Sequence, residues 1–527
     1  MLPLSLSTTL LAVSSLALAD LPPHYTLQIQ PTAPDASMEV PADFFSFGFE
    51  TAFFNHFEND FSENLVHSIN SRMSKPLVLR IGGTSGDLVQ FRESQSEAAV
   101  CQGAKGCPFS SENTFVLGPS YFNAFKRFEG THMTFQAPIN PKKESEDWIR
   151  ESMDYVRHAA ETLGHDRITG IALGNEPDYY AYGLEKYISR ALLLEKKIID
   201  DLGLKNESRR IFELGDIPNS VIKRDVGTWG ITNLLRDNLN KNGLGKYAAQ
   251  HYYQIEHPGE GTDDNIQALL MNHTAISRRF PGIEENIKYI HNSDDKIDFV
   301  ISETGSVIGE EPVRFAAGFG AALWAVDFHL KAMSHGVKRV SNTFRPVATH
   351  SFWIPDNSAS KTTSDAAVHA IFISAPYVAD FVGEGGSLGR VIEIEVPGQP
   401  DLFSAYAMYD LQTGRIQRIA LVNLKEWYPK MGTPRGQVEI TLDTGDMTLT
   451  QSGTVKRMQA ENGSRGMGLD LGGLDDNVTW AGEQWTHNID LGRGHFPHGR
   501  QQDTLQFFGG KAVVSIPDSE AVMVSFD

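Results

Sequence analysis

Between about residue 40 and residue 355, short apolar runs alternate with longer segments of helical periodicity, and this pattern constrains the fold more than any other feature of the sequence. Such alternation is typical of βαβ units that share a parallel sheet. The apolar runs predict eight strands, at 45–49, 77–81, 134–137, 170–173, 210–214, 248–253, 298–301 and 338–343. Amphipathic helices are expected between them, for example over 147–163 and 184–202. Eight strands favour a closed (β/α)8 TIM barrel over an open doubly wound sheet.

After about residue 375 the pattern changes to short alternating runs that are separated by Gly, Pro, Asp or Asn. Runs of this kind are typical of an antiparallel β-sandwich, and they lie at 391–396, 402–409, 417–424, 437–442, 453–458 and 511–516. The Gly-rich stretch 463–473 is expected to be a loop. The predicted α/β fold is therefore a catalytic barrel over 41–370 and a β-sandwich domain over 371–527. Segment 20–40 is expected to be able to pair with the sandwich, because residues 25–30 also alternate.

The first 19 residues contain no charged side chain and end in Ala17-Leu18-Ala19. A small-x-small ending after an apolar stretch is typical of a signal-peptidase site, so residues 1–19 are predicted to be a signal peptide and the protein to be secreted and extracellular. The alternative is a buried N-terminal helix. The longest later apolar run, 315–326, is about a dozen residues and too short to span a bilayer, so it predicts a buried barrel helix and no membrane partner is expected.

Two further features fit an extracellular protein. Cys101 and Cys107 are the only cysteines and lie close together in a Gly-rich segment, which favours a disulfide; a metal pair is disfavoured because no second pair exists. The glycosylation pattern Asn-x-Ser/Thr occurs four times, at Asn206, Asn272, Asn462 and Asn477.

The charge of the chain excludes some partners. With 66 acidic and 46 basic residues, the formal net charge is −20. A nucleic-acid partner is therefore not expected, and a long polyanionic substrate would be repelled unless a local basic cleft received it. No GxGxxG or P-loop motif follows the first predicted strand, and no HExxH motif is present. No cofactor and no metal are expected from these motifs.

Two acidic residues stand apart because each directly follows an apolar run of the predicted barrel. Glu176 follows the fourth run, in the sequence IALGNEP, and Glu303 follows the seventh, in DFVISETG. Barrel enzymes place their active sites at the C-terminal ends of the strands. Strands four and seven face each other across the barrel mouth, so the two carboxyl groups could approach to about 5–5.5 Å, the separation found in retaining glycosidases. A helix N-cap is the alternative role for Glu303.

Five motifs resemble glycoside hydrolase family 79, the β-glucuronidase and heparanase family of clan A. They are LRIGGT at 79–84, GNEP at 174–177, HYY at 251–253, SET at 302–304 and FAAGF at 315–319, and they occur in the family's order across the whole predicted barrel. The C-terminal part also resembles the family's β-domain. The resemblance implies a retaining exo-β-glucuronidase that acts on β-glucuronides, including 4-O-methyl-glucuronides, or on polysaccharide side chains that bear glucuronic acid.

The resemblance also implies roles for individual residues. Glu176 would be the general acid/base and Glu303 the nucleophile. Asn175 would bind the 2-OH of the sugar, a contact that strengthens in the transition state. Tyr253 and Arg80 would lie beside Glu303 and keep its carboxylate ionised and aligned.

Other positions match the family less well. Asp87 matches a position near substrate hydroxyls, and His251 is as consistent with a hydrogen-bonded wall residue as with a catalytic one. The family often has one Tyr after the nucleophile and a second after strand eight, both near the uronate carboxylate. By an ungapped count this chain has Ile308-Gly309-Glu310 at the first position, and the second position falls near Phe352. The backbone N–H of Gly309 is then the expected remaining donor to a uronate.

Three alternatives remain open at the level of sequence. A neutral-sugar β-glycosidase of the same clan stays open because the two tyrosines are missing. A non-catalytic carbohydrate-binding protein would not require both glutamates. A metal-dependent hydrolase could use His251, His257 and His350, although their spacing matches no known ligand motif.

Overall fold

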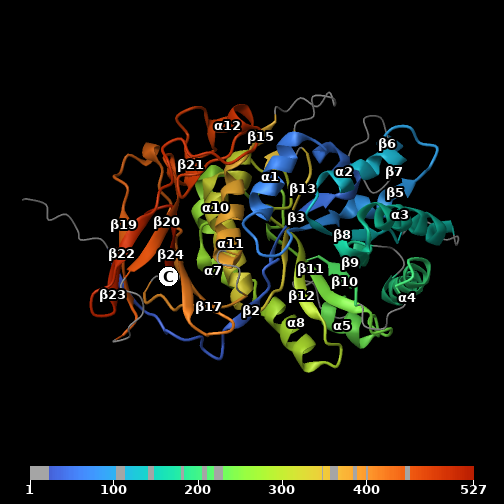
Figure 1. Ribbon diagram of the computed structural model, residues 1–527, viewed down its shortest axis with the longest axis horizontal. Helices are drawn as coiled ribbons and strands as arrows, with labels where there is room; N and C mark the ends of the chain where they lie inside the picture. The colour runs from blue at the N-terminus through green and yellow to red at the C-terminus, as the bar shows by residue number, and fades with distance from the viewer. Residues whose placement is uncertain are drawn as a thin grey trace, which may run out of the picture.

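The computed structural model describes residues 23–102, 113–139, 147–179, 183–204, 210–218, 229–346, 348–355, 366–383, 388–398, 401–445 and 452–526. These residues form a barrel surrounded by helices and a second domain built from two β-sheets (Figure 1). The predicted signal peptide over 1–19, Asn206 and Cys107 lie outside the described residues.

Eight of the described strands close into a parallel barrel in chain order, which confirms the predicted (β/α)8 fold. They are β3 (Phe45–Glu50), β4 (Val78–Gly82), β8 (His132–Ala137), β9 (Ile168–Leu173), β10 (Phe212–Ile217), β11 (Gly245–Ile255), β12 (Asp298–Val307) and β13 (Val340–Phe344). The strand predicted at 298–301 is shorter than β12, because backbone pairing with β11 continues to Ile255↔Val307. Glu303 therefore lies inside this strand and not directly after it.

Helices surround the barrel. The longer ones are α1 (Asp60–Asn70), α3 (Asp147–Leu163), α4 (Gly183–Asp201), α8 (Pro281–Asn292), α10 (Phe319–Ser334) and α11 (Ser374–Gly383). The shorter ones are α2 (Asn123–Arg127), α5 (Ile231–Arg236), α6 (Ile266–Leu269), α7 (His273–Ser277) and α9 (Val313–Ala317). In α3 the residues Trp148, Ser152, Tyr155, Val156 and Ala159 are buried at helical spacing, as expected for one apolar face against the barrel.

The apolar run 315–326 does not form one helix. It divides at Gly318, whose extended backbone separates α9 from α10, and a Cβ on Gly318 would lie 2.3 Å from the carbonyl oxygen of Arg314. Helix α10 is buried on nearly all sides, because α10 and α11 stand between the barrel strands and the second domain (Figure 1). Within the described part of the chain, the search for a helix long and apolar enough to cross a membrane finds none.

The second domain is a sandwich of two sheets, as predicted. The larger sheet contains β2 (Met38–Val40), β16 (Gly389–Glu393), β17 (Phe403–Asp410), β18 (Ile416–Asn423), β24 (Glu520–Phe526), β20 (Ser452–Ala460) and β21 (Val478–Trp480), with β22 (Asp503–Gln506) beside β20. The smaller sheet contains β1 (His24–Gln28), β19 (Gln437–Asp443) and β23 (Lys511–Pro517). The N-terminal strand β1 pairs with β19 in parallel, so this sheet is mixed.

Strand β24 was not expected from the sequence, although it lies between β18 and β20 in the larger sheet. Val522 and Val524 face the apolar core between the two sheets, whereas Ala521 and Met523 belong to the barrel-side core. Both faces of the strand are buried, so its sequence lacks the apolar–polar alternation of a half-exposed strand.

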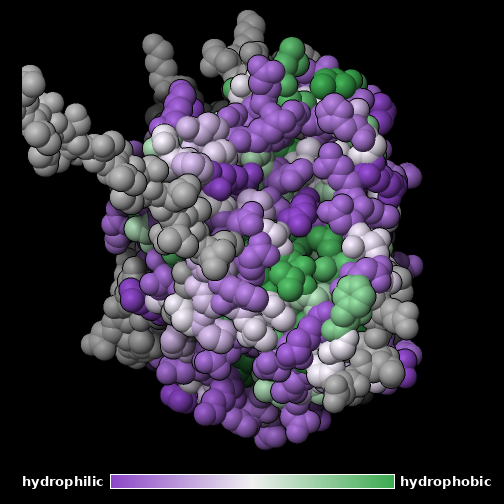
Figure 2. Space-filling view, turned by 90° about the vertical axis from the view of Figure 1, so that its left-hand side faces the viewer, coloured by the Kyte–Doolittle hydropathy of each residue, from purple (hydrophilic) through white to green (hydrophobic). Residues whose placement is uncertain are grey.

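The join between the domains and the expected loop can also be located. Helix α11 (Ser374–Gly383) packs with the barrel and lies beyond residue 370, and the sandwich strand β16 begins at Gly389. The stretch 463–473 is a loop interrupted by the short turns η10 (Gly463–Arg465) and α12 (Leu469–Gly472). The sandwich end of the molecule is mainly hydrophilic, with a small group of hydrophobic side chains near its centre (Figure 2).

A small sheet of β5 (Val89–Phe91), β6 (Ala99–Gln102) and β7 (Thr114–Leu117) follows β4. Cys101 lies in β6 and is disulfide-bonded. Among the predicted glycosylation sites, Asn272 caps α7 by accepting from the N–H of Ala275, and the Nδ2 of Asn477 donates to Glu461 at 3.0 Å. Asn462 is partly buried before η10. Glycosylation of these residues stays a prediction.

Candidate active site

Glu176 lies in the loop directly after β9, at the C-terminal mouth of the barrel. Its backbone has φ of 44°, in the left-handed region that a non-glycine residue rarely adopts. The N–H of Glu176 donates to the carbonyl of Asp216 at 2.8 Å, which holds this conformation in place. The side chain is 16% exposed. A strained backbone that its surroundings fix is common where a functional side chain must be aimed.

Glu303 projects from β12 on the opposite side of the mouth, where its side chain is 9% exposed. The hydroxyl of Tyr253 donates to Oε1 at 2.7 Å, and Nη1 of Arg80 donates to Oε2 at 2.9 Å. Burial alone would raise the pKa of Glu303, but the charges of His251 and Arg80 and the two hydrogen bonds hold that pKa below its ordinary value. Glu303 is therefore held as a carboxylate.

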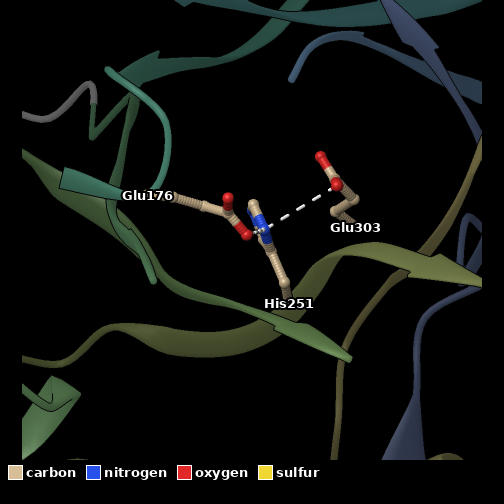
Figure 3. Close-up of side chains that lie close together, drawn as sticks. All are labelled: Glu176, His251 and Glu303. Atoms are coloured by element: carbon tan, nitrogen blue, oxygen red, sulfur yellow. Dashed lines mark hydrogen bonds and ion pairs between the residues drawn. The ribbon is translucent and has the colours of Figure 1, made fainter. Parts of the chain in front are cut away.

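His251 on β11 lies between the two glutamates (Figure 3). Its Nδ1 is 3.0 Å from Oε1 of Glu176 and 3.9 Å from Oε1 of Glu303, and its Nε2 is 3.4 Å from Oδ1 of Asp216. Burial works to lower the pKa of His251, but Glu303, Asp216 and Glu176 together raise it to about 10. The ring is therefore an imidazolium that links the acidic groups, a more central place than a wall residue has.

Asp216 on β10 is a site residue that the sequence reasoning missed. Its Oδ1 accepts from Ser302 Oγ at 2.5 Å and from Arg80 Nη2 at 3.3 Å. Burial works to raise the pKa of Asp216, but Arg80 and His251 lower it below its ordinary value. Asp216 follows the fifth apolar run by two residues, so its position at a strand end was the available signal.

Glu50 was missed in the same way and ends β3. Its Oε2 accepts from the N–H of Ser85 at 3.1 Å and from Oγ of Ser85 at 2.5 Å. Burial and the neighbouring charge of Glu303 raise the pKa of Glu50 to about 7, against the opposing effect of Arg345. Glu50 therefore adds a carboxyl group that can carry a proton near neutral pH.

Asp87 and Asn175 build the floor beside Glu176. Both carboxylate oxygens of Asp87 accept backbone N–H groups, Oδ1 from Ile139 at 2.8 Å and Oδ2 from Asn175 at 2.9 Å. Asn175 in turn accepts from Nη2 of Arg80 through Oδ1 at 3.0 Å. Asp87 thus positions Asn175, whose side chain reaches the charged centre of the site.

The two positions expected to replace the family tyrosines lie in different environments. Ile308 follows β12 and is 44% exposed. Phe352 is buried and packs against Phe47 and Phe344, with ring centroids 5.5 and 5.9 Å away. Phe47 belongs to the apolar core outside the barrel wall, so Phe352 contributes to packing and not to the surface of the pocket.

Gly309 follows Ile308 and lies close to Pro258 and Glu311. A Cβ on Gly309 would lie 2.8 Å from Cβ of Pro258 and 3.0 Å from Oε2 of Glu311. The site therefore needs glycine here for close approach of the chain.

Within the described ranges, Glu176, His251 and Glu303 are the single set of potential metal ligands that converges, with ligand atoms within 4.8 Å of one another. His257 and His350 are not in this set, so the alternative of a metal site built from His251, His257 and His350 is not supported by the geometry. An oxygen of Glu176 and an oxygen of Glu303 thus lie within 4.8 Å across the mouth.

Comparison with known proteins agrees with this architecture. Residues 405–523 match the glycosyl hydrolase family 79 C-terminal beta domain. The chain is 25% identical over 502 residues to a β-glucuronidase of Aspergillus niger, across 87% of this chain and 85% of that protein. It is 26% identical over 519 residues to a β-glucuronidase of Neurospora crassa, across 89% of this chain and 88% of that protein.

Solved structures with the same fold include two glycosidases. A 4-O-α-L-rhamnosyl-β-D-glucuronidase from Fusarium oxysporum, in complex with Rha-GlcA, superposes with a TM-score of 0.77 at 16% identity, over 95% of this chain and 100% of that chain. A family 51 α-L-arabinofuranosidase from Bifidobacterium longum superposes with a TM-score of 0.60 at 12% identity, over 95% of this chain and 99% of that chain. At these identities the likeness establishes the fold alone.

Proposed function

The chain belongs to glycoside hydrolase family 79 and is related to its β-glucuronidases, and on that basis we propose that it is a secreted retaining exo-β-glucuronidase. The observation that carries the proposal is the pair of carboxyl groups across the barrel mouth, whose nearest oxygens lie within 4.8 Å. Retaining glycosidases hold their carboxyl groups about 5–5.5 Å apart, whereas inverting enzymes need about 6.5–9.5 Å to admit a water.

In the first step, the Glu303 carboxylate attacks the anomeric carbon while Glu176 protonates the leaving oxygen. The bond to the aglycone breaks and a glycosyl ester of Glu303 forms. Tyr253 and Arg80 each bind one oxygen of Glu303, which aims the nucleophile. His251 donates to Glu176 and holds it toward the leaving group.

In the second step, Glu176 takes a proton from water, and the resulting hydroxide attacks the anomeric carbon. The ester bond to Glu303 breaks, and the sugar leaves with its β-configuration retained. Asn175, beside Glu176, would bind the 2-OH in both transition states. Apart from the substrate and one water molecule, this mechanism uses only side chains at the mouth.

The relatives support one substrate class. Two relatives are named β-glucuronidases, which supports a β-linked glucuronic acid as glycone. A neutral-sugar β-glycosidase is the second candidate, because the exposed residue after β12 is the apolar Ile308. Strong net negative charge disfavours a long polyanionic chain as substrate.

A panel of 4-nitrophenyl β-glycosides tests the proposal. We expect a higher kcat/KM for the glucuronide than for the glucoside, galactoside or xyloside. Proton NMR of the first product should show the β-anomer before mutarotation. A higher kcat/KM for the glucoside would transfer the assignment to the neutral-sugar alternative, and an α-anomer as first product would exclude double displacement.

Substitution of the acid/base tests the division of roles. In Glu176→Ala, the first step should persist with an aryl glycoside whose leaving group needs no protonation. Added azide should then attack the glycosyl ester and release a β-glycosyl azide. Unchanged hydrolysis of a poorly activated substrate in this variant would contradict the role of Glu176.

Secretion has its own test. The mass of the protein recovered from the culture medium of a eukaryotic host should correspond to a chain that begins at Asp20. Treatment with an N-glycosidase should lower that mass further. A product that retains residues 1–19 would contradict the predicted cleavage.

A further inference from the structure

The carboxylate of a uronic acid brings a further negative charge into a site that already contains several carboxyl groups. Glu176, Glu303, Asp216 and Glu50 surround the mouth, and Glu311 lies beside Gly309. The cations Arg80 and His251 are each bound to these carboxylates. A further cation would therefore stabilise an anionic glycone, because burial of an unpaired charge is strongly unfavourable.

The position of that cation follows from the sugar ring. In a pyranose, C2 and C5 are opposite corners of the ring. If Asn175, after β9, binds the 2-OH, the C5 carboxylate points to the opposite side of the barrel. In the closed order of strands β3, β4, β8, β9, β10, β11, β12 and β13, the strand four places from β9 is β13.

Arg345 directly follows β13. Alternate residues of a strand share one face, and Arg339 marks the inner face because its guanidinium reaches Thr134 on β8 at 3.4 Å. Thr343 faces the same interior, where a Cβ on Gly48 would lie 2.3 Å from its Oγ1. Arg345 is the next position of this alternation, one residue beyond the end of β13. Its carbonyl accepts from the N–H of Ala348 at 3.1 Å and from Oγ of Ser351 at 2.8 Å, which fixes the backbone.

The charge of Arg345 acts on the pocket. Burial raises the pKa of Glu50, and Arg345 opposes this effect. Burial lowers the pKa of His350, and Arg345 lowers it further. His350 is a wall residue of the site, since its ring centroid lies 6.1 Å from that of Tyr253. The Arg345 side chain is 25% exposed, compared with 1% for Arg80, so Arg345 lies nearer the rim of the mouth than Arg80 does.

One contact of Arg345, with Glu310, is readily displaced. Nη2 of Arg345 lies 3.5 Å from Oε1 of Glu310, in the loop after β12, and the Glu310 side chain is 70% exposed. An ion pair with so exposed a carboxylate contributes little to stability. A substrate carboxylate that arrives with the sugar ring already bound can therefore replace Glu310.

We propose that Arg345 binds the C5 carboxylate of the glycone and exchanges Glu310 for it, so that Arg345 is the residue that selects a uronic acid over a neutral sugar. The proposal rests on the proposed β-glucuronidase activity. It assigns the carboxylate to a guanidinium, with its strong charge-assisted hydrogen bonds, and not to the N–H of Gly309 beside Glu311. Arg345 binds the substrate away from the reacting atoms and serves specificity.

The test compares 4-nitrophenyl β-glucuronide, its uncharged methyl ester and the β-glucoside in four proteins: wild type, Arg345→Gln, Arg345→Lys and Glu310→Gln. Loss of a hydrogen bond to a charged group corresponds to about a 10- to 100-fold effect, so Arg345→Gln should lower kcat/KM for the glucuronide by that factor. The ester and the glucoside should change by less than about threefold. Arg345→Lys should restore part of the loss, and Glu310→Gln should lower KM for the glucuronide.

The control variant is Arg314→Gln, which removes an exposed arginine paired with Asp263 at 2.8 Å on the neighbouring helix α9 and should leave all three substrates unchanged. An equal loss on all three substrates in Arg345→Gln would reduce Arg345 to a structural role. A glucuronide preference that survives in Arg345→Gln would overturn the assignment while leaving the proposed function intact. A wild-type preference for the glucoside would instead overturn the proposed function before any variant is compared.

Discussion

Two buried histidines in this molecule are each held between carboxylates, one at the barrel mouth and one between the domains. His251 at the mouth contacts Glu176 and Asp216. His273 of α7 contacts Asp327 of α10 at 2.9 Å and Glu393 of β16 at 2.8 Å. Burial works to lower the pKa of each histidine, but the neighbouring carboxylates raise it to about 10 in both cases. By charge state alone the two histidines cannot be distinguished.

The difference lies in how each network is completed. At the interface, Lys331 binds Glu393 at 2.6 Å and the hydroxyl of Tyr406 donates to Asp327 at 2.6 Å. Two cations there meet two carboxylates, and the side chains come from the barrel and the sandwich. The interface network is therefore balanced and complete, as expected for a contact that fixes one domain against the other.

At the mouth, acids exceed cations. Three cations, Arg80, His251 and Arg345, act on four acids: Glu176, Glu303, Asp216 and Glu50. Burial and Glu303 raise the pKa of Glu50 to about 7. Such an excess favours a bound proton, which general acid catalysis requires. A buried histidine between two acids is therefore no evidence of catalysis by itself; an imbalance of charge at an accessible barrel mouth is.

Removal of one carboxylate from each network should separate the two roles most strongly. Glu303→Gln should lower kcat by about 10⁴-fold or more, because no glycosyl-enzyme can form. The matched change Glu393→Gln should leave kcat of the folded enzyme within about twofold, because Glu393 lies at the domain interface and not at the barrel mouth. Steady-state kinetics on purified, folded protein measures both.

A similar loss of kcat in both variants would contradict the comparison. Circular dichroism before each assay serves as the control for folding. Retention of turnover in Glu303→Gln would contradict the assignment of the nucleophile.

The interface network should dominate stability. Asp327→Asn leaves the His273 imidazolium and the Tyr406 hydroxyl without their carboxylate partner, and a broken buried pair destabilises by about 3–5 kcal/mol. Urea unfolding followed by tryptophan fluorescence measures this change, and kcat at low urea should stay at the wild-type level. A loss of kcat without a loss of stability would contradict a purely structural role.

The same network predicts a pH window for that stabilisation. The pKa of His273 is raised from 6.5 to about 10 by Asp327 and Glu393 against the effect of burial, so its contribution is complete below about 6.5 and is lost as pH rises toward 10. The pKa of Glu393 is lowered from 4.5 to about 2 by His273 and Lys331 against the effect of burial, so its contribution is complete above about 4.5 and is lost toward pH 2. The difference in unfolding free energy between wild type and Asp327→Asn should therefore be largest between pH 4.5 and 6.5.

The sequence could predict the barrel and the two glutamates but not the whole site. Strand positions followed from apolar runs, and Glu176 and Glu303 followed from acids at the ends of runs in motifs that resemble a family. Glu50 and Asp216 occupy equivalent positions after other runs, but 66 acidic residues made position alone too weak a signal. Only the folded chain brings their charges together.

Phe352 and Arg345 show a second limit. The resemblance put the family position after strand eight near Phe352, yet Phe352 packs outside the barrel wall against Phe47 and Phe344. Which residue after β13 faces the pocket depends on where the strand ends and how the chain turns. That geometry depends on tertiary contacts such as the hydrogen bond from Ser351 to the carbonyl of Arg345, which a local pattern does not encode.

The mouth network should also control the acidic limb of the activity profile. Burial works to raise the pKa of Glu303. The charge of His251 is the largest single effect that lowers it, ahead of the charge of Arg80. Without the imidazolium, the pKa of Glu303 should rise, so Glu303 becomes protonated and inactive at a higher pH. In His251→Asn, the acidic limb of kcat/KM against pH should therefore move upward relative to wild type. An unchanged limb, measured on a substrate with an activated leaving group, would show that His251 does not act on Glu303.

The smallest expected effect is that of metal removal. Glu176, His251 and Glu303 have ligand atoms within 4.8 Å of one another, but metal ligands must be deprotonated. Burial works to lower the pKa of His251, but the surrounding carboxylates raise it to about 10. Both ring nitrogens face carboxylates, which keep them protonated. At pH 5–7 a metal would have to displace a proton from a stabilised imidazolium. Dialysis against EDTA should therefore leave kcat/KM unchanged within error. The interface variant Glu393→Gln, dialysed in the same way, is the control for effects of the treatment on the fold. A loss of activity that zinc or manganese restores would replace the two-carboxylate mechanism with a metal-dependent one.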